Sequence, residues 1–517
     1  MSRRAPTGHP GKVSLTYSSA RGRWALSATV LGSAIAFLDA TVVGIALPRI
    51  GKDFHADVAS LQWVVSGYTL TLAAFLLLGG TLGDRFGRRR IFMIGVAWFA
   101  LASIGCGLAP TAGFLVGARV VQGIGAALLT PGSLAIIQAS FAPEDRARAI
   151  GAWSGLGGLA AAAGPLVGGY LLLVASWRWV FFINIPLAAF VLWISARHVP
   201  ESLDPNAPDE IDVPGATLAV VWLAALTYTL IDGAALGWTP SVVGALVIAV
   251  GGLVAFIWVE WRREHPMLPL TVFRSRQFSA ANAVTFVVYA SLSGALFLLP
   301  IQLQQVNGYS PIEAGMSFLP VTFLMLFLSP RSGRLASRIG PRLQMSAGPV
   351  VAGAGLALLS RTATDSNYVT GVLPGVLVFG LGLSITVAPL TSTAMSAAPA
   401  EHAGLASAVN NDVARFGGLV AVAVLPAAAG LTGEAYLHPA TFSAGFRTAV
   451  LICAVMCACG GVLAAFTISN AGFGSLRVGA APRVVSDPAA PGCVATSRSG
   501  ADGPRTGATA AGTDGSP

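Results

Sequence analysis

Apolar runs of roughly twenty residues, separated by short polar and basic segments, repeat along most of this 517-residue chain. A helix of that length crosses the hydrocarbon core of a bilayer, which is about 30 Å thick. The residue alternation of a membrane β-barrel is missing, and an open sheet would leave backbone groups unpaired in lipid. The pattern therefore predicts an all-α integral membrane protein.

The first run extends from Ala25 to Leu47 and is interrupted only by Asp39. A cleaved signal peptide is the alternative, but the run continues past its cleavage-like Ala34-Ile35-Ala36, which favours a retained helix. About fourteen spans are predicted in total. The others are expected at 61–82, 91–109, 112–137, 150–174, 179–197, 215–235, 241–261, 279–303, 313–331, 343–361, 368–393, 404–430 and 446–468.

An internal repeat indicates how these spans are grouped. The segment Gly80–Arg88 recurs as Gly333–Pro341, and two further features follow in the same order at nearly the same offset. Parallel repeats are typical of alternating-access transporters, which hold their substrate between two similar bundles. The predicted organisation is an N-tail at 1–24, a six-helix bundle at 25–197, a linker at 198–214, two inserted helices at 215–261, a loop at 262–278, a second six-helix bundle at 279–469 and a disordered tail at 470–517.

Charge supports this topology. Only 10% of residues are charged while 54% are hydrophobic, which leaves too few charges to cover a soluble globule. The net charge of +9 comes from basic clusters between apolar runs, so we read it as membrane topology and expect no nucleic acid partner. Of 31 Lys and Arg residues, 24 fall on the N-terminal side of the predicted membrane. Both termini are therefore expected in the cytoplasm, with the protein in the cytoplasmic membrane.

Two ionisable residues lie deep in predicted spans. Asp39 is about 22 Å along its helix from Trp24, where an ionised carboxylate is unfavourable unless it is paired or hydrated. This position favours a proton-carrying role over a purely structural hydrogen bond. Arg119 keeps its charge and needs a carboxylate or water nearby, so it is the candidate that adjusts proton release.

Gating candidates occur in two segments. Asp84 and the neighbouring arginines in Gly80–Arg90 suggest a charged latch, whereas the second copy has Ser337 in place of Asp84. Glycines around Pro165 suggest a bent, closely packed helix at a moving interface. The predicted gating residues are Gly80, Asp84, Arg85, Gly87, Arg88, Gly164, Pro165, Gly168 and Gly169.

Aromatic and polar side chains within the spans are candidates for a substrate cavity. Asp412 and Arg415 are three residues apart, so a local ion pair is the simpler interpretation for them. Asp232, Glu260 and Glu313 fall near helix ends and are expected to be solvated. The predicted cavity residues are Trp63, Tyr68, Gln122, Asn410, Asp412 and Arg415.

No motif of an enzyme is present. The sequence lacks HExxH, a Walker loop and a nucleophile elbow, and no histidine stands near Cys453 and Cys457 to complete a metal site. We therefore expect no catalysis, no metal, no cofactor and no ATP, so that transport would run on the proton gradient.

These segments resemble the major facilitator superfamily, and within it the fourteen-helix drug:proton antiporters. The resemblance covers about residues 23–470. It rests on Leu38–Pro48, Gly80–Arg90, Arg119–Ala127, Gly164–Gly169 and Trp177–Pro186. The motif in Arg119–Ala127 is the one linked to proton coupling, and that in Gly164–Gly169 is associated with antiporters. A usual glycine is replaced by Ala160, and 314–327 has no acid, which argues against a dicationic substrate.

The resemblance implies two six-helix bundles, two linking helices, and export of a hydrophobic small molecule in exchange for protons. Its expected partners are the lipid bilayer, that small molecule and protons. A proton-coupled importer or metabolite exporter is the alternative on the same fold. A non-transporting receptor or scaffold is the remote alternative, and the intramembrane acid and arginine argue against it.

Overall fold

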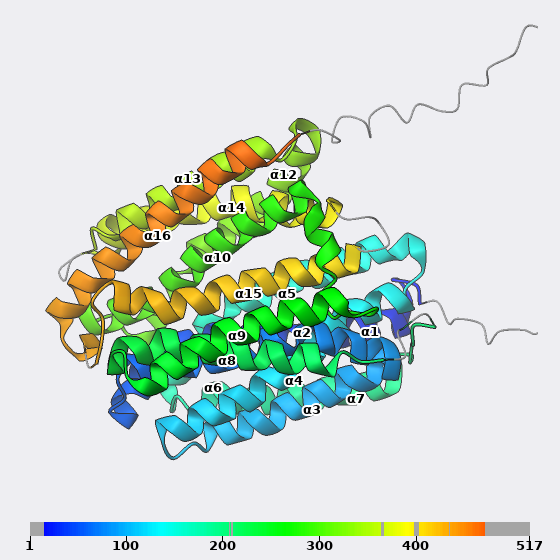
Figure 1. Ribbon diagram of the computed structural model, residues 1–517, viewed down its shortest axis with the longest axis horizontal. Helices are drawn as coiled ribbons and strands as arrows, with labels where there is room; N and C mark the ends of the chain where they lie inside the picture. Colours follow the sequence, from blue (N-terminus) through cyan, green and yellow to red (C-terminus); the bar gives the residue numbers. More distant parts are fainter. Residues whose placement is uncertain are drawn as a thin grey trace, which may run out of the picture. The chain divides into compact units, whose positions relative to one another are not determined.

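The computed structural model describes residues 15–470 except 206, 208, 209, 363–366, 398–402 and 434. The predicted tail at 470–517, apart from Asn470, and most of the N-tail lie outside these residues. Helices account for the described secondary structure apart from one isolated bridge between Leu15 and Phe141, so the all-helical prediction is confirmed. The helices run side by side with their connections at two ends (Figure 1).

The helices fall into two sets joined by a hairpin. The first set is α1 (Ala20–Phe54), α2 (Val58–Phe86), α3 (Arg88–Gly107), α4 (Ala112–Ser140), α5 (Pro143–Val174), α6 (Trp179–Phe182) and α7 (Asn184–His198). The hairpin is α8 (Val213–Leu236) and α9 (Pro240–Arg262). The second set is α10 (Arg276–Ile301), α11 (Pro311–Met316), α12 (Leu319–Ile339), α13 (Arg342–Leu359), α14 (Leu373–Ser396), α15 (Ala403–Ala428) and α16 (Pro439–Thr467).

Thirteen spans in the described residues are long and apolar enough to cross a membrane. Each predicted run coincides with a helix or a pair of consecutive helices. The one run outside the thirteen is α13, which has 18 residues and begins with Arg342. The helix α1 extends from 20 to 54 rather than 25 to 47, because helix continues through the polar residues that flank the apolar run. The protein is thus a multi-pass membrane protein.

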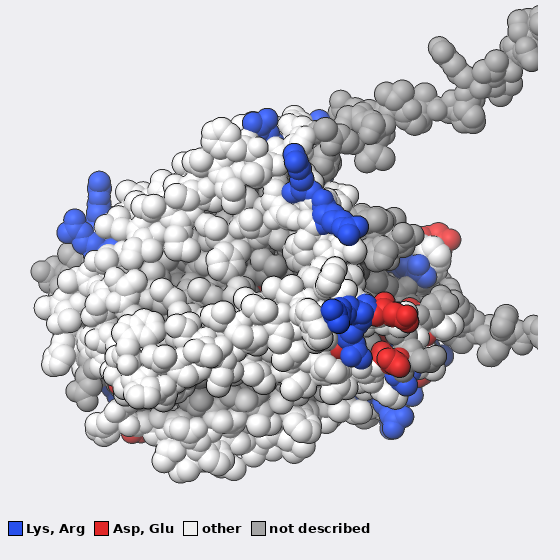
Figure 2. Space-filling model, viewed as in Figure 1, with Lys and Arg blue, Asp and Glu red and all other residues white. Residues whose placement is uncertain are grey.

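Side-chain chemistry separates the ends of the spans from their middle. We call the end that carries Arg85 and Arg88–Arg90 the basic end. The face seen in Figure 2 is mostly free of Lys, Arg, Asp and Glu, which gather toward the ends. An apolar band of this kind matches the hydrocarbon core of a bilayer.

The two sets repeat the same packing. A Cβ on Gly125 of α4 would lie 2.7 Å from the backbone N of Phe99 on α3. A Cβ on Gly382 of α14 would lie 2.2 Å from the backbone N of Ala352 on α13. Both helix pairs therefore need glycine for close contact, as small residues permit in membrane bundles. We call the sets the N-half (α1–α7) and the C-half (α10–α16).

The halves meet through hydrogen bonds at the end opposite the basic end. The side-chain amide of Gln62 donates to Val422 O at 2.7 Å and to Ala423 O at 2.9 Å, joining α2 to α15. Gln304 Nε2 donates to Ile45 O at 3.0 Å. These bonds close the contact between the halves at this end.

Candidate functional site

Asp39 lies on α1 and is fully buried inside the N-half. Its carboxylate accepts three kinds of donor: Arg119 NH1 at 2.5 Å, Gln122 Nε2 at 2.9 Å and Asn184 Nδ2 at 3.0 Å. Every partner donates, so the geometry is that of an ionised carboxylate. Oδ1 accepts from both Gln122 and Asn184, and Oδ2 accepts from Arg119.

Arg119 lies on α4 and is 1% exposed. Besides Asp39, it donates from Nε to Val64 O at 3.1 Å and from NH1 to Gln122 Oε1 at 2.6 Å. Its guanidinium carbon stands 4.2 Å from the ring centroid of Tyr68 on α2, a cation–π contact. The arginine therefore ties α4 to α1 and α2 around one buried charge pair.

Sequence reasoning missed two members of this cluster. Asn184 begins α7, and Ser103 on α3 accepts from Gln122 Nε2 at 2.9 Å and from Asn184 Nδ2 at 3.3 Å. Both side chains are fully buried. Asn184 had a visible signal, an amide within a long apolar run, whereas a serine in a span gives none. We call Asp39, Arg119, Gln122, Asn184 and Ser103 the acid cluster.

The predicted latch occupies the basic end of the N-half. Arg88 Nε and NH2 both lie 2.7 Å from Asp84 Oδ1, and Arg88 NH2 lies 4.0 Å from Asp204 Oδ2. Gly80 lines the adjacent cavity, and the Arg85 guanidinium lies over the Phe86 ring.

A second charged contact at this end was not predicted. Gly87 has φ +109°, and a Cβ there would lie 2.8 Å from the Glu201 carboxylate. That carboxylate accepts from the backbone N–H groups of Arg89 at 3.0 Å and Arg90 at 3.2 Å. Glu201, in the predicted linker, therefore caps the N-terminus of α3.

The C-half has a neutral counterpart of this arrangement. Gly340 has φ +88°, and Asn470 Oδ1 accepts from the backbone N–H of Arg342 at 3.1 Å. Ser337, at the position of Asp84, donates to Arg334 O at 2.8 Å. Among the described residues Ser337 thus bonds to backbone, as expected for a copy without the charged latch.

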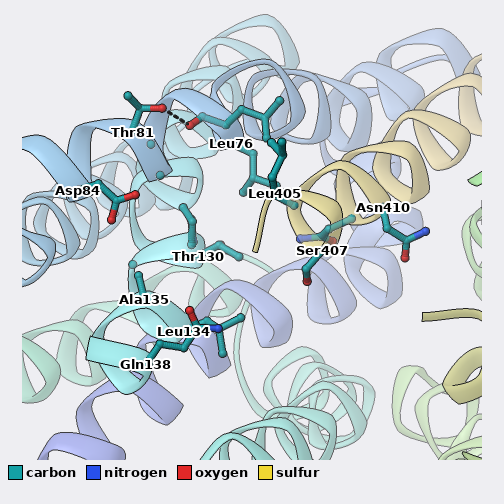
Figure 3. A pocket seen from close by; sticks show the side chains of 18 of the residues that line it. Leu76, Thr81, Asp84, Thr130, Leu134, Ala135, Gln138, Leu405, Ser407 and Asn410 are labelled. Atoms are coloured by element: carbon teal, nitrogen blue, oxygen red, sulfur yellow. Dashed lines mark hydrogen bonds between the residues drawn. The ribbon is translucent and has the colours of Figure 1, made fainter. Parts of the chain in front are cut away.

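A central cavity of about 510 Å³ lies between the halves and reaches the latch. It is lined from the N-half by Asp84, Thr130 and Gln138 and from the C-half by Ser407 and Asn410, as Figure 3 shows. Its size suits a small molecule, and its lining mixes apolar surface with a few polar groups.

The predicted cavity residues have different fates. Asn410 lines the central cavity and donates to Thr285 Oγ1 at 2.8 Å. Tyr68 and Gln122 lie instead in and beside the acid cluster. Trp63 faces α8, where its Nε1 donates to Asp232 Oδ2 at 2.9 Å, so its placement in the cavity was wrong.

Asp412 and Arg415 do not form the local ion pair we expected. Among the ion pairs of the described residues, none joins Asp412 to Arg415. Asp412 Oδ1 and Arg415 Nε are instead buried without a hydrogen-bond partner.

Glu260 was expected to be solvated, but the structure buries it, with only 2% of the residue exposed. Its Oε2 accepts a hydrogen bond from the backbone N–H of Leu268 at 2.8 Å.

The glycines of α5 make close contacts. A Cβ on Gly164 would lie 1.9 Å from Thr41 Oγ1, and one on Gly168 would lie 3.0 Å from Val42 Cγ1, both on α1. Gly169 and Pro165 face α11 instead. The predicted glycine segment is therefore where α5 packs against both α1 of its own half and α11 of the C-half.

Across the described ranges, no group of three His, Cys, Asp or Glu side chains is arranged to hold a metal ion.

Comparisons with known proteins agree with this architecture. Residues 29–423 match the sequence profile of the Major Facilitator Superfamily. The multidrug resistance protein Stp of Mycobacterium tuberculosis is 38% identical over 80% of this chain and 77% of its own length. The tetracenomycin C resistance and export protein of Streptomyces glaucescens is 38% identical over 79% and 76%. A crystal structure of a D-xylose–proton symporter superposes with a TM-score of 0.63 at 15% identity, covering 87% of this chain and 99% of that one.

Proposed function

Because this chain belongs to the major facilitator superfamily, and because its relatives are named as drug and antibiotic resistance proteins, we propose that it exports a hydrophobic small molecule in exchange for protons. Transport would use alternating access across the cytoplasmic membrane. The basic end and both termini would face the cytoplasm, as the excess of Arg and Lys there favours. The proton gradient would drive the cycle without ATP, a metal or a cofactor.

The observation that carries this proposal is the acid cluster. Asp39 holds Arg119 through a buried charge pair, and both residues also bond Gln122. A proton arriving at Asp39 cancels the charge that holds the guanidinium, leaving it buried without a counterion. That arrangement is unfavourable, so protonation favours a different packing of α1 against α4. Proton binding at Asp39 thereby biases the protein between its two states.

The substrate would bind in the central cavity, where both halves contribute lining residues. In the described arrangement the halves are joined at the opposite end by the bonds from Gln62 and Gln304, while the cavity reaches the latch at the basic end. With the basic end in the cytoplasm, this arrangement would correspond to an inward-open state. Asp84 and Arg88, at the mouth of the cavity, would act as the gate.

Everted membrane vesicles test the proposal. With a panel of antibiotics in a host that lacks its own pumps, the wild-type chain should raise resistance, and a compound so identified should accumulate in everted vesicles only when a proton gradient is applied. Asp39→Asn should abolish that accumulation in vesicles matched for the amount of the chain.

Glu144→Gln is the matched control, since Glu144 is an exposed acid in the first turn of α5. It should transport at the wild-type rate. Full gradient-driven accumulation by Asp39→Asn would refute the proton-carrying role, and flux that ignores the gradient would refute antiport altogether.

A further inference from the structure

Two lateral seams run between the halves, and the α8–α9 hairpin covers one of them. This is the seam between α2 and α15. Trp63 on α2 hydrogen bonds Asp232 on α8, while Trp222 on α8 packs edge-on against Phe416 on α15, with ring centroids 5.5 Å apart. The hairpin thus contacts both halves and separates this seam from lipid (Figure 1).

The other seam lies between α5 and the α11–α12 pair. Away from the basic end it is shut by backbone contact. A Cβ on Gly315 would lie 2.2 Å from Pro165 O, and a Cβ on Gly169 would lie 2.6 Å from Ile312 Cα. No side chain fits between the helices at these points.

On the basic-end side of these contacts, α5 and α12 part around the opening of a second cavity of about 520 Å³, which extends inward as far as Ile45. It runs from the protein surface inward. Leu159 and Leu326 at its mouth are 52% and 41% exposed, while Phe379 and Leu383 at its back are 4% and 1% exposed. We call this space the seam cavity.

The lining of the seam cavity is chemically selective. Leu, Ile, Val, Met, Phe and Pro side chains dominate it, and among the described residues none that line it is Asp, Glu, Lys or Arg. Gly155 and Gly158 on α5 line it with no atom within 4 Å of a hypothetical Cβ. A space of this size and polarity suits an uncharged apolar molecule.

The seam cavity adjoins the central cavity. On α1, Phe37 lines the central cavity and Thr41, one turn further, lines the seam cavity. On α5 the neighbours Trp153 and Ser154 line the central cavity and the seam cavity, respectively. The seam cavity therefore stands between the lipid-facing surface and the space where both halves meet.

We propose that the seam cavity is the entrance through which an uncharged, apolar molecule dissolved in the bilayer reaches the central cavity. This inference rests on the proposed export function and specifies its substrate class and route. The hairpin makes the route one-sided, because it covers the other of the two lateral seams formed by the described helices. The shut outer part of the α5 seam places the entrance toward the basic end.

Efflux of Nile red, a neutral dye that partitions into membranes, tests this entrance in energised cells that lack their own pumps. Gly158→Trp fills the seam cavity without meeting another atom at Cβ and should slow proton-driven efflux at least fivefold. Gly251→Trp is the matched control: Gly251 is also open at Cβ, but it lies exposed on α9. Its rate should stay within twofold of wild type.

A cysteine variant that is modified only after folding separates a blocked entrance from misfolding. Gly158→Cys should export Nile red normally until a bulky N-substituted maleimide caps its thiol, whereas the parent chain treated in the same way should be unaffected. Normal efflux by Gly158→Trp and by the capped thiol would overturn the entrance while leaving the export function intact. Wild-type cells that resist antibiotics but never move Nile red would also overturn it; failure of both readouts would reject the export function itself.

A lipid chain is the rival occupant. In phosphatidylcholine vesicles containing a trace of lipid with a photoreactive diazirine at the acyl terminus, labelling of Leu159 and Leu326 should fall when Nile red is added. Labelling that Nile red does not reduce would assign the cavity to lipid and overturn the proposal.

Discussion

The charge pair between Asp39 and Arg119 makes a prediction that separates stability from transport. Asp39→Asn keeps the shape of the side chain but removes its charge, and it leaves the guanidinium of Arg119 buried. The two side chains are 0% and 2% exposed, so water cannot compensate. Removing one partner of such a pair costs about 3–5 kcal/mol. We expect Asp39→Asn to lose most of that amount.

The double variant Asp39→Asn with Arg119→Gln removes both charges. Removing both charges leaves no uncompensated buried ion, so the double variant should regain most of the lost stability. The two changes should therefore be coupled by about 2–3 kcal/mol. Proton-driven efflux should stay absent in both variants, since neither has a titratable carboxyl at this position.

Thermal unfolding of the purified chain in detergent, followed by size-exclusion chromatography, measures the stabilities, and everted vesicles measure the flux. Glu144→Gln again serves as the control and should match wild type in both measurements. Equal stability of Asp39→Asn and the double variant would refute the idea that Arg119 depends on Asp39. Efflux by the double variant would refute the idea that Asp39 carries the proton.

Three further predictions follow from the packing. Gly125→Ala should destabilise the bundle by about 1–3 kcal/mol through overpacking against Phe99, whereas Gly117→Ala on the same helix has open space and should be neutral in the same thermal assay. Asp84→Asn should slow efflux severalfold in vesicles while changing thermal stability by less than about 1 kcal/mol, since its bond to Arg88 is partly exposed; an unchanged rate would argue against a gate. Glu201→Ala should speed hydrogen exchange of the Arg89 and Arg90 amides and cost about 0.5–2 kcal/mol, and unchanged exchange would contradict its role as a helix cap.

Hydropathy predicted the spans well because an apolar run in lipid must pair its own backbone groups, and a helix does this within the segment. The intramembrane charges Asp39 and Arg119 were also identifiable, because a charged side chain within the hydrocarbon core needs a partner of opposite charge or water. Helix ends were less accurate: α1 continues beyond its apolar run because helix geometry persists through Arg21 and Lys52.

The remainder of the acid cluster was harder to predict. Asn184 and Ser103 are uncharged, and such residues occur in spans for many reasons. Trp63 was misplaced because one sequence does not show which face of a helix meets α8. Glu201 stands among other acids in a segment that looked like a linker, and only its contact with the α3 amides distinguishes it.

The caps at Glu201 and Asn470 fasten the segments that follow α7 and α16 to the start of α3 and of α13, respectively, at the basic end. The hydrogen bonds from Gln62 and Gln304 instead join one half to the other, at the end opposite the basic end. Each half is therefore held together as a unit at the basic end, while the two halves are joined to one another at the opposite end. Opening of that end would require the hydrogen bonds from the Gln62 and Gln304 side-chain amides to break, while the caps within each half remain intact.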